Sequence, residues 1–288
     1  MNKKASKIFS KIIFWILVVY LFIYFVFPFY WTINTSLKTE NQLLMTPATF
    51  IPVDHLTGEA VFSLQNYKAV FTNPTFINGL KNSLIVALSV TILCLIIGSF
   101  AAFALGKLRF KGKRFSLYLI LSMTMFPQIS VLTGLYAVIN KFHISAIPAM
   151  IFSYFLFTLP FTIWVMTSFF KGLPNSLMQA ANVDGATAFQ SFYMILLPLT
   201  APAMVTTGLL AFIAAWNEYL FALTFTSIEE SARTVPVAMA LFTGTIAKQE
   251  PFGEIMAAAV VVTIPLLILI YIFQKKLIEG LTAGAVKG

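Results

Sequence analysis

The stretch QAANVDGATAFQSFYMILLP, residues 179–198, lies between apolar runs that are long enough to cross a bilayer. It starts with polar and small residues, reaches Asp184-Gly185, and ends at Pro198. Because glycine readily accepts a positive φ, Asp184-Gly185 predicts a turn between two short helices. Two short helices joined at an angle would form a compact foot outside the lipid. A soluble partner could move the flanking membrane helices through such a foot.

The composition indicates a membrane protein. The 288 residues are 59% hydrophobic and only 10% charged, whereas a soluble domain usually carries about 25% charged residues. Runs without Asp, Glu, Lys or Arg reach the ~20 residues that a transmembrane helix needs. Six intervals meet this length: 12–37, 82–106, 115–140, 142–170, 185–217 and 255–274. We therefore predict an all-α integral membrane protein with six transmembrane helices.

The chain is expected to form one transmembrane domain over residues 1–288, without an internal repeat or a separate soluble domain. Pro127 and Pro160 fall inside predicted helices, where neighbouring groups can satisfy the freed carbonyls. The predicted helices cover about 12–34, 82–106, 115–140, 147–170, 198–224 and 255–274, with an outer loop at 35–80 and a cytoplasmic loop, here called the coupling loop, at 171–196.

The basic residues give the predicted orientation. With the N-terminus inside, most of the 19 Lys and Arg residues lie on the cytoplasmic side, and cytoplasmic loops of membrane proteins carry such an excess. This bias predicts that both termini are cytoplasmic. The densest cluster, KLRFKGKR at 107–114, is expected to meet anionic lipid headgroups. The net charge of +9 is thus explained without nucleic acid, for which the chain has no recognition motif.

The coupling loop by itself leaves two interpretations open. Pro174 suits the first turn of a new helix, and Asn175 or Ser176 could cap it. The resulting short helices could be an ordinary amphipathic connector on the membrane surface, or a docking foot for a soluble partner. Physical chemistry alone slightly favours the connector.

The spacing within the coupling loop resembles the signature of permease subunits of ABC importers. That signature combines an EAA triplet, a glycine four residues after its last alanine, and Ile-x-Leu-Pro further along. Gln179 stands where the family usually has Glu, so docking would lack the charge-assisted bond of a carboxylate to a basic group. The matching residues are Ala180, Ala181, Gly185, Ile195, Leu197 and Pro198.

The resemblance covers nearly the whole chain and points to the smaller six-helix permease of the maltose-type carbohydrate branch. It rests also on Asn66-Tyr67, Asn82-Ser83, WNEY at 216–219 and GLTAGAVKG at 280–288. It implies a permease subunit of an ATP-driven importer of a sugar, with an oligosaccharide expected, in the cell membrane of a prokaryote. The implied partners are a second permease in a heterodimer, two ATP-binding subunits that bind ATP and Mg, and an extracytoplasmic sugar-binding protein.

The resemblance also implies functional residues. Contacts to the ATPase are implied for Gln179, Ala180, Ala181, Asp184, Gly185, Ala186 and Phe189, with the loop ending at Ile195, Leu197 and Pro198. Because the family's tail reaches toward the ATPase pair, Gly284, Lys287 and Gly288 are implied as secondary contacts.

Two polar groups are candidates for the substrate pathway. Gln128, Ser130 and Thr133 could bind sugar hydroxyls or, as polar residues commonly do in bundles, neighbouring helices. The second group is Trp216, Asn217, Glu218 and Tyr219. Intramembrane acids often mark function, but Glu218 lies 20 residues after Pro198, or ~30 Å along a helix. We therefore favour a structural or gating role for Glu218 over direct substrate contact.

Several motifs are absent from the sequence. It has no G-x-x-x-x-G-K-[ST] phosphate loop and no dinucleotide fingerprint, so we expect neither an enzyme nor a cofactor bound by this chain. His55 and His143 are isolated, which argues against a metal site. The alternatives are an ABC permease for a non-sugar solute, an ion-driven secondary transporter, and a scaffold or insertase.

Overall fold

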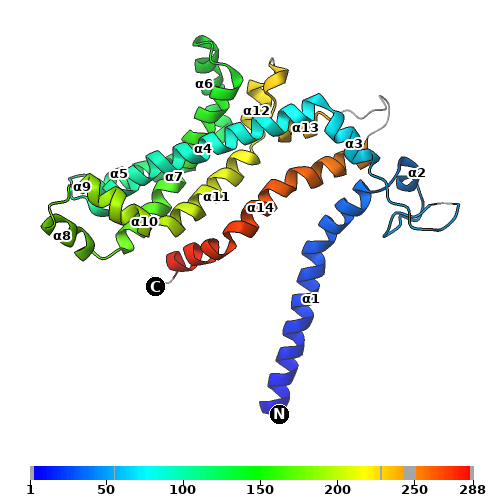
Figure 1. The fold of residues 1–288 in the computed structure, drawn as a ribbon, viewed down its shortest axis with the longest axis horizontal. Helices are drawn as coiled ribbons and strands as arrows, with labels where there is room; N and C mark the ends of the chain where they lie inside the picture. The colour runs from blue at the N-terminus through cyan, green and yellow to red at the C-terminus, as the bar shows by residue number, and fades with distance from the viewer. Residues whose placement is uncertain (1–2, 55, 228, 243–250, 286–288) are drawn as a thin grey trace. The chain divides into compact units, whose positions relative to one another are not determined.

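The computed structural model describes residues 3–54, 56–227, 229–242 and 251–285. These residues are mostly helical (Figure 1), and the backbone pairing outside helices is an isolated bridge between Val53 and Ala60. The chain forms two compact units. Unit 1 comprises residues 1–74 and 241–263, and unit 2 comprises residues 75–240 and 264–288.

Unit 1 contains the N-terminal helix and a folded loop. Helix α1 (Lys3–Ser36) is followed by the short helices α2 (Glu40–Leu43) and α3 (Gln65–Thr72), and α14 (Phe252–Ala285) begins in this unit. Within α1, the membrane-length stretch Phe9–Ser36 buries none of its most apolar window against the described chain. Such a surface is compatible with lipid or with another membrane subunit.

A buried lysine organises the loop between α1 and α3. Lys38 is 3% exposed. Its Nζ donates to the carbonyl of Thr49 (2.6 Å) and lies 5.3 Å from the ring centroid of Trp31. Burial lowers the pKa of the Lys38 ammonium. Asn66 Nδ2 donates to the carbonyls of Ser36 and Lys38. The predicted outer loop is thus a packed, hydrogen-bonded structure and not an open connection.

Unit 2 is built on the long helices α4 (Pro74–Lys107), α7 (Ala146–Gly172) and α11 (Ala201–Trp216), of which α7 and α11 lie side by side. The other elements are α5 (Lys113–Ser122), η1 (Met123–Met125), α6 (Gln128–Lys141), α8 (Ser176–Val183), α9 (Ala188–Ser191), η2 (Phe192–Leu196), α10 (Leu197–Leu199), α12 (Leu220–Phe225), η3 (Glu230–Ala232) and α13 (Val235–Ala240).

Several helices are long and apolar enough to cross a membrane. Within the described residues, four single helices qualify: Phe9–Ser36, Pro74–Lys107, Ala146–Gly172 and Phe252–Leu277. Two bent helix pairs raise the number to six if each pair is one span. The prediction of an all-α, multi-pass membrane protein is confirmed, while the count of six spans and the cytoplasmic termini stay predictions.

The predicted helix over 115–140 is sharply bent at Pro127. The chain forms Lys113–Met125 and Gln128–Lys141, which meet at an angle of 93°. Phe126 between them is extended, with φ −73° and ψ 128°. The ring of Pro127 causes this, because a proline disfavours helical backbone at the residue before it.

The predicted helix over 198–224 is divided as well. The helical stretches Ala188–Leu199 and Ala201–Trp216 meet at 76°. Pro198 and Pro202 flank this bend, and neither has a backbone N–H to donate to the preceding turn. The second stretch ends at Trp216, and α12 forms a separate short helix.

The ends of two other helices lie beyond their predicted limits. α4 begins at Pro74 and not near residue 82, and α14 continues to Ala285 and not to about residue 274. The predicted limits were set by charge. Lys275 and Lys276 have good helix propensity, however, so they mark the end of an apolar run without ending the helix.

Candidate functional site

The first short helix of the coupling loop ends in a glycine turn. The C-cap of α8 is Asp184, and Gly185 has a φ of +80°. The amide of Ala186 donates to the carbonyl of Ala181 (2.9 Å), and the amide of Gly185 donates to the carbonyl of Asn182 (3.1 Å). These two bonds form a Schellman motif, in which glycine is favoured because the left-handed backbone costs it nothing. The predicted turn at Asp184-Gly185 is confirmed.

The second helical segment starts at a capping box. Thr187 Oγ1 accepts from the amide of Gln190 (3.2 Å), and Gln190 Oε1 accepts from the amide of Thr187 (2.8 Å). Each side chain therefore satisfies a backbone donor that the first turn of α9 leaves open. The helix then widens to a π turn, in which the amide of Leu197 donates to the carbonyl of Phe192.

The Thr187→Ala substitution is expected to loosen α9. It removes the acceptor for the amide of Gln190, and the loss of such a cap costs about 1 kcal/mol. Amides at 188–191 should exchange with deuterium faster in the variant, whereas Thr187→Ser should keep the protection because serine caps equally well. Equal exchange in Thr187→Ala and the parent would show that the capping box is not stabilising.

An aromatic cluster, here called the seat, anchors the coupling loop to the long helices. The seat comprises Phe100 and Phe103 of α4, Phe170 of α7, and Phe192 of η2. The ring centroid of Phe192 lies 4.9 Å from that of Phe100, 4.9 Å from that of Phe103 and 6.2 Å from that of Phe170. The buried core around it is completed by Ala102, Met166 and Leu196. The coupling loop is therefore in direct contact with α4 and α7 through Phe192.

At its C-terminal end, α4 lies very close to α7 and donates hydrogen bonds to the start of the coupling loop. A Cβ at Gly106 would lie 2.6 Å from the Cβ of Phe170, so α4 and α7 nearly touch at this level. The adjacent Lys107 Nζ donates to the carbonyl of Leu173 (2.5 Å) and to Asn175 Oδ1 (3.1 Å). Asn175, a predicted cap, makes no side-chain cap bond in α8. Lys107 thus holds the start of the coupling loop, although the basic cluster was expected to meet lipid headgroups.

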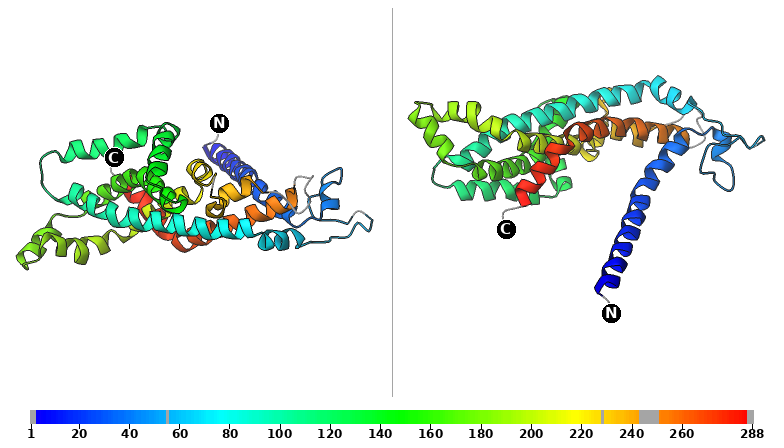
Figure 2. Two further views of the ribbon diagram at one scale, coloured as in Figure 1. Left: turned by 90° about the horizontal axis from the view of Figure 1, so that it is seen from above. Right: turned by 60° about the horizontal axis from the view of Figure 1, so that its bottom comes forward.

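The coupling-loop residues that the resemblance to ABC-importer permeases singled out differ in their exposure to solvent. In Figure 2, both views place the coupling loop at one end of unit 2. Gln179, Ala180, Asp184, Gly185, Phe189 and Pro198 are exposed, whereas Ala186, Ile195 and Leu197 are half-buried. Ala181 is 3% exposed, so its small side chain serves packing inside the chain. The exposed group is the surface that a partner can reach.

The structure describes only one of the three C-terminal residues that the resemblance implied as contacts to the ATPase. Gly284 lies in the last turns of α14, which ends at Ala285. Lys287 and Gly288 lie outside the described residues. The role of all three in binding the ATPase stays a prediction.

Glu218 caps a helix. Its Oε1 accepts from the amide of Phe221 (2.9 Å), and its Oε2 accepts from the amide of Ala222 (3.1 Å). These amides belong to the first turn of α12, where backbone donors have no partner within the helix. The break after Trp216 therefore gives Glu218 the structural position that the sequence favoured.

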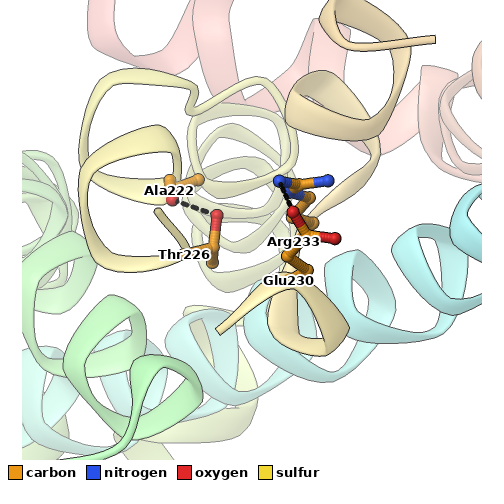
Figure 3. A network of polar contacts seen from close by, with 4 residues as sticks. All are labelled: Ala222, Thr226, Glu230 and Arg233. Carbon is orange, nitrogen blue, oxygen red and sulfur yellow. Dashed lines mark hydrogen bonds and ion pairs between the residues drawn. The ribbon is translucent and has the colours of Figure 1, made fainter. Parts of the chain in front are cut away.

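The segment after α12 is fixed by polar contacts (Figure 3). Thr226 Oγ1 donates to the carbonyl of Ala222 (2.7 Å), and Arg233 pairs with Glu230 (2.8 Å). Asn82 Nδ2 of α4 donates to the carbonyl of Arg233 (2.9 Å). The first two contacts are local, whereas the Asn82 bond ties the segment after α12 to α4, a long helix of the same unit.

A cavity of about 320 Å³ lies beside Glu218, between α7, α11, α12 and the start of α6. Of the predicted pathway residues, Gln128 and Glu218 line it, whereas Ser130, Thr133, Trp216, Asn217 and Tyr219 do not. Trp216 is instead buried against Phe212, with ring centroids 5.5 Å apart. The lining also includes Tyr154 and Thr158, which the sequence analysis missed because single polar residues in an apolar run carry no pattern.

Apolar helices of membrane length, with an exposed loop packed against them, are compatible with the membrane subunit of a multi-part transporter. The profile of the family described as "Binding-protein-dependent transport system inner membrane component" matches residues 72–282. The chain belongs to this family. The resemblance to permease subunits of ABC importers is confirmed, and the chain is a multi-pass membrane permease that works in a complex with other subunits.

Individual relatives are similar in sequence to this chain over nearly its full length. The trehalose/maltose transport system permease protein MalG of Thermococcus litoralis is 42% identical over 91% of both chains. The trehalose transport system permease protein SugB of Mycobacterium tuberculosis is 38% identical, covering 92% of this chain and 93% of SugB. The sulfoquinovosyl glycerol transport system permease protein SmoH of Agrobacterium fabrum is 38% identical, covering 91% of this chain and 89% of SmoH.

A solved structure shares the fold. A crystal structure of a bacterial ABC transporter involved in the import of the acidic polysaccharide alginate aligns with a TM-score of 0.80. The alignment covers 94% of this chain and 97% of that one at 20% identity. At this identity the likeness describes the architecture alone.

Proposed function

We propose that this chain is the permease subunit of an ATP-driven sugar importer in the cell membrane of a prokaryote. Its relatives at 42% and 38% identity carry the names of trehalose/maltose and trehalose permeases, which supports a saccharide as the solute. The proposed partners are a second permease, two ATP-binding subunits and an extracytoplasmic sugar-binding protein. ATP and Mg bind to the ATP-binding subunits, and this chain performs no catalysis.

The proposed mechanism rests on the exposed residues of α8 and α9 and on the aromatic seat, in which Phe103, Phe170 and Phe192 are buried. Closure of the ATPases pulls on the exposed residues of the coupling loop. Phe192 passes this displacement to Phe103 and Phe170, whose rings lie 4.9 Å and 6.2 Å from it. α4 and α7 then tilt and open the pathway toward the loaded binding protein, and ATP hydrolysis resets the loop.

The alternatives differ in energy source or solute. An ion-driven secondary transporter is disfavoured because the family is binding-protein-dependent. A scaffold or insertase would show no dependence of ATPase activity on solute. A permease for a non-sugar solute is distinguished by the ligand that stabilises the cognate binding protein in a thermal-shift screen.

Neighbouring alanines provide a matched test of docking. Ala180 is exposed and Ala181 is 3% exposed, on the same helix. We expect Ala180→Cys to crosslink to a cysteine on the ATPase surface in the assembled complex, with a yield that changes with nucleotide. Ala181→Cys should crosslink far less, because the chain's own residues cover it. The absence of any Ala180→Cys crosslink in every nucleotide state would refute docking through this surface.

A further inference from the structure

The wall of the cavity beside Glu218 contains a buried hydroxyl that is not saturated by the protein. Tyr154 of α7 is 3% exposed, and its hydroxyl faces the Glu218 carboxylate without a hydrogen bond of good geometry within the described chain. A buried polar group with an incomplete set of hydrogen bonds is destabilising. Such a group is normally satisfied by protein or water, so a hydroxyl of this kind on a cavity wall is available to a ligand that enters the cavity.

Other polar groups on the cavity wall retain hydrogen-bonding capacity. Glu218 accepts one amide on each carboxylate oxygen, and a carboxylate has about four acceptor sites. Thr158 Oγ1 donates its hydrogen to the carbonyl of Tyr154 (2.7 Å), which leaves the oxygen able to accept. The amide of Gln128 can both donate and accept. The wall thus offers donors and acceptors together, as a polyhydroxylated ligand requires.

The rest of the wall is apolar and aromatic. Phe157, Phe161 and Phe221 line the same cavity, and the Phe157 and Phe221 rings lie 5.3 Å apart. Flat apolar rings beside a few convergent polar groups are typical of small-molecule sites, and about 320 Å³ is at the lower end of their usual volumes. The C–H faces of a sugar ring fit against the aromatic rings, while its hydroxyls face the polar groups.

The charged groups that line the cavity distinguish anionic sugars from uncharged ones. Its titratable lining residues are Tyr154 and Glu218, and the lining contains neither Lys nor Arg. An anionic sugar would bring a second negative charge toward the Glu218 carboxylate without a cation to balance it, which is unfavourable in a low-dielectric site. The cavity therefore favours an uncharged sugar.

We propose that this cavity is a binding subsite for one uncharged sugar ring in transit, which the Tyr154 hydroxyl and the free acceptor sites of Glu218 recognise. This inference rests on the proposed function, because the sugar reaches the cavity only if the chain conducts it. The site lies within this permease, separate from the exposed surface that docks the ATPase.

Tyr154→Phe is the direct test, because it removes the hydroxyl alone. The measurement uses the complex of both permeases and the ATPases, purified without the binding protein, so that the membrane subunits are the site of sugar binding. Trehalose, maltose and glucuronic acid are titrated as probes, and the apparent Kd is taken from the shift in Tm. We expect trehalose or maltose to raise the Tm of the parent complex, and Tyr154→Phe to weaken that binding about three- to tenfold.

Matched variants separate this loss from misfolding. Tyr154→Phe should leave the Tm without sugar close to that of the parent, because the ring stays in place and the hydroxyl makes no hydrogen bond of good geometry. Tyr271→Phe makes the same change on an exposed tyrosine of α14 and should leave binding intact. Glu218→Gln retains one acceptor for the α12 amides and should reduce discrimination against glucuronic acid.

Each outcome decides the proposal. The subsite is overturned if Tyr154→Phe binds sugar with the affinity of the parent, or if glucuronic acid binds as well as the uncharged sugars. Importer function is measured separately, by ATP-dependent uptake with the binding protein, and would still stand in either case. If the fully assembled parent complex takes up no saccharide, the proposed function falls and the subsite falls with it. Weakened sugar binding confined to Tyr154→Phe supports the subsite.

Discussion

Replacing Phe192 by alanine is expected to disconnect the coupling loop from the long helices. Phe192 is 2% exposed and its ring centroid lies 4.9 Å from those of Phe100 and Phe103. Truncating a buried phenylalanine typically costs about 3–5 kcal/mol. The expected result is a lower Tm of the complex, with ATP hydrolysis that continues while sugar uptake into proteoliposomes falls strongly. The measurement compares uptake per ATP hydrolysed between variant and parent.

Met194→Ala is the matched control for this substitution. Met194 lies in the same π-helical segment but is 63% exposed, so truncation leaves no cavity in the seat. Its uptake per ATP should stay close to that of the parent. A Phe192→Ala complex that couples ATP hydrolysis to uptake as well as Met194→Ala does would show that the seat does not transmit the motion.

Adding a single methyl group at Gly106 is expected to force α4 and α7 apart. The new Cβ would lie 2.6 Å from the Cβ of Phe170, a separation that requires the helices to shift. Overpacking of this kind typically costs about 1–3 kcal/mol. Gly106→Ala should therefore lower the Tm of the complex and reduce uptake, even though alanine has the higher helix propensity.

Gly134→Ala tests the same chemical change where there is room for it. A Cβ at Gly134 in α6 meets nothing within 4 Å, so the substitution should be neutral or stabilising by up to ~1 kcal/mol. We therefore expect Gly106→Ala to lower the Tm of the complex and Gly134→Ala to leave it unchanged or raise it. If Gly106→Ala matched Gly134→Ala in Tm and uptake, the close approach of α4 and α7 would be unimportant.

Features set by short stretches of sequence were predictable. Hydropathy over ~20 residues depends on local composition alone, so the apolar spans and the membrane class followed directly. The turn at Gly185, with its φ of +80°, was predictable because the preference for left-handed backbone belongs to the glycine itself. The spacing from Ala180 to Pro198 identified the family because it needs no knowledge of what those residues touch.

The two prolines inside predicted helices show where local rules fail. Pro160 remains inside the continuous helix α7 and is buried, whereas Pro127 separates α5 and η1 from α6 at an angle of 93°. Both lack a backbone N–H, so their chemistry is the same. The structure differs because neighbouring helices pack around Pro160, while Phe126 and Pro127 are exposed.

The sequence alone determined a helical membrane protein with a turn in the coupling loop, since hydropathy and glycine geometry act over a few residues, and the resemblance of its motif spacing indicated a permease. Tertiary structure decided that Ala180 faces outward while Ala181 faces the chain, and that Phe192 joins α4 and α7. It also turned Glu218 into a helix cap and placed the Tyr154 hydroxyl on the same cavity wall. These properties depend on contacts between segments distant in sequence, and an apolar residue carries no local signal of which neighbour it will meet.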